Sequence, residues 1–165
     1  AKSKYAAEKL IQHNCNKYLI CRAGWMMGGG PEKDKKFVNK IYKQIVKGNK
    51  ELFVVKDKLG TPTYTHDFVK NLFKILESGH LGLYNLVCEG NTSRLEVAKE
   101  ILITLNLESK ISIKAVNSDY FSTKFFAPRP KSENLINYKL NLRSLNIMRD
   151  WRVCLREYLN NEFKT

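Results

Sequence analysis

Several patterns that define other classes of protein are missing from this sequence. No apolar run reaches the roughly 18 to 20 residues that a membrane-spanning helix needs, so we expect no membrane partner. No cysteines form a CxxC pair and the histidines are scattered, so no metal site is predicted. No strand-like segment leads into the GxGxxG fingerprint of a dinucleotide-binding turn, because Gly28, Gly29 and Gly30 are adjacent rather than spaced.

Features of secreted proteins are also scarce. The four cysteines lie mostly in apolar patterns, and we expect them to be reduced, buried thiols of a cytoplasmic protein. The sequence opens on Ala1 within a helical pattern and has no signal-like start. We therefore expect residues 1–165 to be part of a longer protein.

The charge is strongly positive, at +13, but its composition does not favour nucleic acid as a partner. Lysine outnumbers arginine 22 to 7, and the lysines are spread along the chain. Lys33, Lys35 and Lys36 form the only tight cluster. We expect this charge to help attract a small anionic substrate rather than a nucleic acid.

Apolar periodicity predicts helices that alternate with short strands. Helical spacing marks residues 3–16, 37–48, 68–79, 93–105 and a last segment from Asp150, whereas short apolar runs predict strands at 18–23, 52–55, 83–87 and 111–116. Ser93 and Glu96 form a capping box, and Asp150 is a likewise suitable N-cap. Residues 60–62 are predicted to be a loop and residues 117–147 to be mostly irregular. This alternation predicts a single α/β domain.

Several segments, taken in order, resemble the dTDP-4-dehydrorhamnose reductase family of extended short-chain dehydrogenases. They are Ser3-Lys4 with Glu8, the segment 21–25 (CRAGW), the segment 59–67 (LGTPTYTHD), the segment 82–85 (GLYN), Ser93 with Glu96 and Ala98, Arg129-Pro130 with Ser132 and Leu135, and the segment 149–152 (RDWR). Their order and spacing carry the resemblance. It implies the carboxyl-terminal, sugar-nucleotide-binding portion of a Rossmann-like α/β fold with mostly parallel strands, without the dinucleotide-binding portion.

Two frames compete for the Tyr-x-x-x-Lys motif of such enzymes. Tyr5 and Lys9 have the spacing, but the family pattern instead makes Lys4 the catalytic and cofactor-binding lysine, with its tyrosine just before Ala1. We prefer the second frame because Ser3 then directly precedes the lysine and Glu8 follows it at the family's spacing. A lysine one turn from a tyrosine favours the phenolate, which tunes the tyrosine as a proton donor to a reduced ketone.

The resemblance also implies the substrate-binding residues, which are Trp25, Pro62, Tyr64, Thr65, Arg129 and Ser132, with Lys124 a lesser candidate. Trp25 would pack against the sugar ring, and the Arg129 guanidinium offers a rigid fork for the diphosphate. Structural roles compete in each case, namely a core tryptophan, an ordinary loop and a surface ion pair. We expect Trp151 to pack the last helix.

The expected function is reduction of a dTDP-4-keto-6-deoxysugar with NADPH or NADH by the longer protein, with this chain alone inactive and binding no cofactor tightly. A dTDP-sugar is the expected partner, and a homodimer is one expected assembly. A catalytically silent regulatory module, or another nucleotide-sugar epimerase or dehydratase, stays open as an alternative. The sequence departs from the family pattern at Ala23-Gly24, at Met26-Met27 and at Lys36, where asparagine is common.

Overall fold

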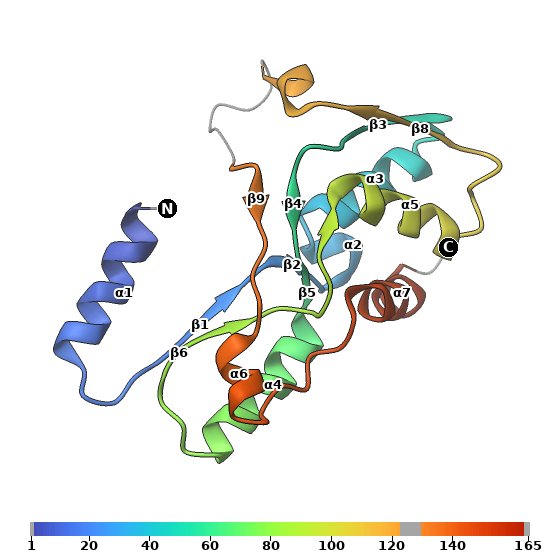
Figure 1. Cartoon of the computed structure of the whole chain (residues 1–165). Coiled ribbons are helices and arrows are strands. Elements are labelled where there is room, and N and C mark those ends of the chain that lie inside the picture. Colours follow the sequence, from blue (N-terminus) through green and yellow to red (C-terminus); the bar gives the residue numbers. More distant parts are fainter. Residues whose placement is uncertain (1, 123–129, 164–165) are drawn as a thin grey trace.

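The computed structural model describes residues 2–122 and 130–163 of the chain. Its helices are α1 (Lys2–Asn14), α2 (Gly30–Lys33), α3 (Phe37–Val46), α4 (Thr65–Glu77), α5 (Arg94–Thr104), the 3₁₀ turn η1 (Ser118–Phe121), α6 (Tyr138–Leu142) and α7 (Trp151–Glu162). Its strands are β1 (Leu19–Ala23), β2 (Trp25–Met27), β3 (Glu51–Val55), β4 (Leu59–Gly60), β5 (Pro62–Tyr64), β6 (Gly82–Leu86), β7 (Thr92–Ser93), β8 (Ser112–Val116) and β9 (Ser132–Glu133). Helices thus alternate with short strands, as predicted (Figure 1).

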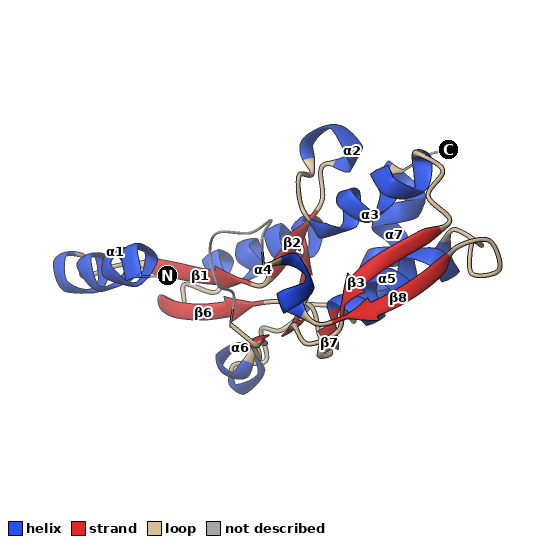
Figure 2. Ribbon diagram, turned by 90° about the horizontal axis from the view of Figure 1, so that it is seen from above, coloured by secondary structure: helices blue, strands red, loops and turns tan. Residues whose placement is uncertain are grey.

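The strands pair in small groups rather than in one wide sheet. Parallel pairing joins β1 to β6, β2 to β5, and β3 to β8, and β4 lies between parallel β9 and antiparallel β7. Figure 2 shows the β1–β6 and β3–β8 pairs toward opposite ends of an elongated molecule, with the short strands between them. Pairing is therefore mostly parallel, which confirms the predicted strand arrangement.

The main hydrophobic core lies under α7, which contacts β5 and α5, and α5 in turn contacts β3. Trp151 is fully buried there, as expected. Both predicted N-caps are present: the Ser93 hydroxyl accepts from the Glu96 amide at 3.1 Å, and the Asp150 carboxylate accepts from the Arg152 amide at 2.8 Å. A smaller cluster around Ile75, Tyr84, Leu86 and Leu140 joins α4 and α6 to β6.

Helix α1 differs from the other long helices because none of its described residues is buried. Figures 1 and 2 both show it set apart from the body of the molecule. Its apolar side chains, including Leu10 and Ile11, are exposed. An ion pair connects α1 to β1: Nε and Nη2 of Arg22 donate to the two carboxylate oxygens of Glu8 at 2.8 and 2.5 Å.

Two local predictions are wrong in part. Residues 60–62 are not all loop, because Gly60 ends β4 and Pro62 begins β5, where it pairs with Trp25, and only Thr61 lies between the strands. The described residues of 117–147 are mostly irregular, as predicted, and the short elements η1, β9 and α6 interrupt them. All four cysteines are free, but only Cys88 and Cys154 are buried, whereas Cys15 is exposed and Cys21 half-buried.

Candidate functional site

Trp25 lies at the centre of the candidate site, where β2 follows β1. Its backbone amide donates to the Thr61 carbonyl at 2.8 Å, and its indole Nε1 donates to the Glu133 carboxylate at 2.7 Å. Its ring lies on Gly60, where an added Cβ would be 2.2 Å from Cε2 of the indole. Only glycine leaves room for the ring here, so β4 and β9 together fix the orientation of a half-buried tryptophan.

Two further side chains complete the surroundings of Trp25. The Arg94 guanidinium, at the start of α5, lies 5.2 Å from the Trp25 ring centroid and 5.3 Å from that of Phe37. These distances are within the range of cation–π attraction. The arginine therefore joins the start of α5, the start of α3 and strand β2 around one aromatic surface.

Sequence reasoning missed Gly60, Arg94 and Glu133 as parts of this site. Glu133 directly follows the predicted Ser132, and β9 pairs Ser132 with Leu59 and Glu133 with Gly60. The Ser132 hydroxyl is exposed and accepts from the Asn134 amide at 3.3 Å. The sequence could have indicated that Glu133 lies close to the indole N–H of Trp25 only if the β4–β9 pairing had already been known.

The predicted residues on β5 and α4 differ in their access to solvent. Pro62 and Tyr64 are buried, and the Tyr64 hydroxyl donates to Glu162 at 3.2 Å. Burial, with the nearby Glu162 carboxylate, raises the pKa of Tyr64 well above its usual range. Thr65 is partly exposed and lines a pocket beside β2. The structure therefore brings Thr65 to the surface next to Gly28 and places the Tyr64 ring in the core, while their substrate roles stay predictions.

The remaining predicted residues lie apart from Trp25 or outside the described part of the chain. Lys4 is exposed on α1, as are Tyr5 and Lys9, whose ammonium lies 5.4 Å from the Tyr5 ring centroid. These positions do not decide between Lys4 and Lys9 as the lysine of the Tyr-x-x-x-Lys motif. Arg129 and Lys124 lie outside the described residues. The Arg22 hydrogen bond lowers the pKa of Glu8, which keeps that carboxylate charged and α1 tied to β1.

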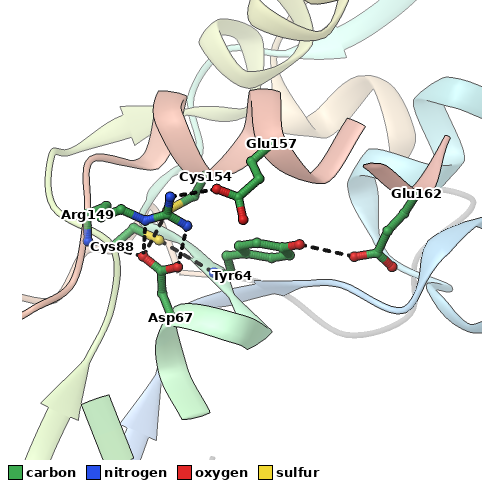
Figure 3. A network of polar contacts seen from close by, with 7 residues as sticks. All are labelled: Tyr64, Asp67, Cys88, Arg149, Cys154, Glu157 and Glu162. Atoms are coloured by element: carbon green, nitrogen blue, oxygen red, sulfur yellow. Dashed lines mark hydrogen bonds and ion pairs between the residues drawn. The ribbon is translucent and has the colours of Figure 1, made fainter. Parts of the chain in front are cut away.

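A polar network next to the site joins the two sequence segments 59–67 and 149–152 that carried the family resemblance (Figure 3). Arg149 contacts Asp67 through Nε at 2.9 Å and Nη2 at 2.6 Å, and Glu157 through Nη1 at 2.6 Å. The Cys154 thiol donates to Asp67 at 3.3 Å. Burial would raise the pKa of Asp67, but hydrogen bonds from Arg149 and Cys154 bring it below its usual value.

This network is structural rather than catalytic in its geometry. Its arginine is saturated by two carboxylates, and hydrogen bonds to these carboxylates raise the pKa of Arg149 further. The pKa of the Cys154 thiol is raised by its contact with Cys88, by burial and by Asp67, which disfavours a reactive thiolate. The network therefore attaches α7 to the start of α4 and so holds β5 beside β2.

The α/β fold of this chain, with helices and short, mostly parallel strands, is that of part of an extended short-chain dehydrogenase. Within that class, the chain belongs to the RmlD substrate binding domain family, whose profile matches residues 1–163.

Similar proteins agree with this assignment. The Bacillus subtilis spore coat polysaccharide biosynthesis protein SpsK is 32% identical over 158 residues, which is 96% of this chain and 52% of that protein. The structure of dTDP-4-dehydrorhamnose reductase from Yersinia enterocolitica matches with a TM-score of 0.87 and 34% identity, over 96% of this chain and 55% of that one. The Bacillus anthracis enzyme of the same name, crystallised with NADP, matches with a TM-score of 0.83 and 29% identity, over 96% and 53%. The chain thus spans about half the length of these relatives.

None of the helices in the described part of the chain combines the length and apolar character needed to cross a membrane. Among the same residues, no group of three or more acidic, histidine or cysteine side chains is arranged to hold a metal ion.

Proposed function

We propose that this chain binds the sugar nucleotide in a reductase that converts dTDP-4-dehydrorhamnose to dTDP-rhamnose, for nucleotide-sugar and surface polysaccharide biosynthesis. The observation that carries the proposal is Trp25, seated on Gly60 and held by Glu133. A fixed, half-buried aromatic ring with a few polar groups around it is the usual form of a site for a small polar ligand. Membership of the family supports the choice of a dTDP-linked sugar.

In this proposal each residue has a distinct task. The face of Trp25 packs against the apolar face of the pyranose ring, while Glu133 fixes the indole edge. The Thr65 hydroxyl, partly exposed at the start of α4, bonds the ligand, and Ser132 borders it. Pro62 and Tyr64 shape the site from β5. Arg129 binds the diphosphate, as the family pattern implies.

The described residues do not fit a complete nicotinamide cofactor site. The Gly28–Gly30 turn leads only into the four-residue α2, which offers no extended helix N-terminus to a diphosphate. Lys4, on exposed α1, is the one residue that the family motif connects with the cofactor. We therefore propose that NADP(H), which supplies hydride when bound, depends on parts of the longer protein beyond this chain.

Isothermal titration of the purified chain with dTDP-rhamnose tests the proposal. Trp25→Ala should weaken binding about tenfold or more, which corresponds to about 1.4 kcal/mol. Phe73→Ala removes an equally aromatic but exposed side chain from α4 and should leave the affinity unchanged. Absence of dTDP-rhamnose binding to the unmodified chain, or equal affinity of Trp25→Ala, would count against the proposal.

Two further measurements examine the diphosphate and the chemistry. Arg129→Ala should cost about 1 to 3 kcal/mol of dTDP-sugar binding, the scale of a lost charged hydrogen bond. The chain alone should not oxidise NADPH in the presence of a dTDP-4-keto-sugar, and measurable turnover would contradict the predicted inactivity. The homodimer and the cytoplasmic location stay predictions, to be examined by sedimentation and by fractionation.

A further inference from the structure

A pocket of about 340 Å³ lies between β2, the start of α4 and the segment 33–36. Its lining consists of Met26, Met27, Gly28, Lys33, Asp34, Lys35, Lys36 and Thr65. Thr65 is also a predicted substrate residue, and Met26 directly follows Trp25 in β2. The pocket therefore shares Thr65 with the proposed substrate residues.

The lining includes three of the positions at which the sequence departs from its family pattern. Met26, Met27 and Lys36 are separated by up to ten positions in sequence, yet all three face the same hollow. The departures therefore place two methionines and one lysine around the pocket.

Buried side chains hold the lysine-bearing turn in place. The Asp34 carboxylate accepts from the Lys36 amide at 2.6 Å and from the Tyr158 hydroxyl at 3.0 Å. The Asn39 amide group donates to the Pro31 carbonyl at 2.8 Å and to the Asp34 carbonyl. Asp34, Asn39 and Tyr158 are each at least 97% buried, with exposed fractions of 3%, 1% and 0%. The turn is therefore fixed from below, and its lysines emerge from a defined backbone.

The charge of the pocket is positive. Lys33, Lys35 and Lys36 are exposed, and none forms an ion pair with another residue in the described ranges 2–122 and 130–163. Asp34 is the acidic residue of the lining, and its carboxylate already accepts two hydrogen bonds. Three ammonium groups against one engaged carboxylate favour an anion in this pocket.

We propose that this lysine pocket is an anion subsite that binds a phosphoryl or carboxylate group of the ligand. Its assignment to a sugar nucleotide rests on the proposed function. The anionic group is either the diphosphate, which Arg129 would then bind jointly with the lysines, or a carboxylate on a sugar other than the 6-deoxysugar of the proposed function. Lys33, Lys35 and Lys36 are then specificity-determining residues.

Calorimetry with a charge-matched pair of variants tests this inference. The pocket variant is Lys33→Gln with Lys35→Gln and Lys36→Gln, and the control is Lys43→Gln with Lys47→Gln and Lys50→Gln, which removes the same charge from exposed positions. The ligands are pyrophosphate, dTDP, dTDP-rhamnose, thymidine, UDP-glucose and UDP-glucuronic acid. Circular dichroism confirms folding, and Lys36→Asn, the residue common in the family, provides a milder second variant.

A phosphoryl subsite predicts that pyrophosphate and dTDP bind about tenfold or more weakly to the pocket variant, while the control changes less than about twofold and thymidine is unaffected. A carboxylate subsite predicts that the unmodified chain prefers UDP-glucuronic acid to UDP-glucose, and that only the pocket variant loses this preference. In either case Lys36→Asn shows a smaller loss in the same direction.

Equal losses of anion affinity in the two triple variants would show an effect of overall charge and would overturn the inference. Unchanged affinity in the pocket variant would also overturn it, and so would the absence of binding of any anion. Unchanged dTDP-sugar binding in the pocket variant would overturn the subsite and leave the proposed function standing. Lysine-dependent pyrophosphate binding without dTDP-sugar binding would support the anion subsite and count against the proposed function.

Discussion

Arg149 and Asp67 lie 82 positions apart in the sequence and form a two-point ion pair, with Nη2–Oδ1 and Nε–Oδ2 distances of 2.6 and 2.9 Å. The Asp67 side chain is only 2% exposed, whereas that of Arg149 is 37% exposed. The pair links the first turn of α4 to the residue before the N-cap of α7 (Figure 3). It thereby connects the strand that borders the candidate site to the helix that covers the core.

Removal of Arg149 should destabilise the fold more than an exposed charge would. Arg149→Met leaves the Asp67 carboxylate buried without its cation, which costs about 3 to 5 kcal/mol for a fully buried pair. Because Arg149 is more than a third exposed, we expect about 2 to 3 kcal/mol, measured as the free energy of unfolding in urea. Lys99→Met, which breaks the exposed pair with Glu96, should cost under about 1 kcal/mol. Equal losses in the two variants would contradict a structural role for Arg149.

The same pair makes stability depend on acid. The pKa of Asp67 is lower in the folded protein than in the unfolded chain. At a pH between these two pKa values, the unfolded state therefore holds more protons than the folded state. The free energy of unfolding contributed by Asp67 is therefore complete above about pH 4, the unfolded value, and is lost as pH falls through the folded pKa. Between about pH 6 and about pH 3, the destabilisation caused by Asp67→Asn in urea titrations should accordingly hold steady down to about pH 4, the unfolded pKa, and shrink below it. A difference that stays constant over that window would show that the carboxylate charge does not contribute.

Gly60 should be essential for the orientation of Trp25. A Cβ there would lie 2.2 Å from the indole, so Gly60→Ala must displace the ring, shift its fluorescence and weaken dTDP-sugar binding. Gly48→Ala is the control, since no atom lies within 4 Å of its added Cβ, although its φ of +83° makes the variant less stable by about 1 kcal/mol. The control should retain the tryptophan spectrum. Unaltered fluorescence and affinity in Gly60→Ala would remove Gly60 from the site.

Helix α1 should exchange its amide hydrogens much faster than α7. It has no buried residue, whereas α7 buries Trp151, Cys154, Leu155, Tyr158 and Leu159. Local opening costs little free energy where few apolar contacts are lost. Hydrogen–deuterium exchange followed by mass spectrometry should therefore show early labelling of 2–14 and late labelling of 151–162, and Arg22→Ala should accelerate only α1. Equally slow exchange of both helices in the isolated chain would reveal a partner surface for α1, such as that of a homodimer.

Periodicity and end signals were enough to place the longer elements. The Ser93 and Asp150 caps and the apolar spacing of α3, α4, α5 and α7 depend on neighbours three or four residues apart, and these contacts are local. The short strands β2, β4, β5 and β9 were missed because two or three residues carry no readable period. Their strand conformation is imposed by partners far along the chain.

The sequence by itself determined the α/β alternation, the family resemblance and the candidate residues, because motif order and helical spacing are properties of the linear chain. Only the tertiary structure decided that Trp25 rests on Gly60 and bonds to Glu133, 108 positions away. It also decided that Tyr64 is buried and that the lysines of 33–36 share one pocket with Met26 and Met27. The physical reason is that hydrogen bonding, burial and charge act over a few ångströms, so they depend on which distant segments the fold brings together.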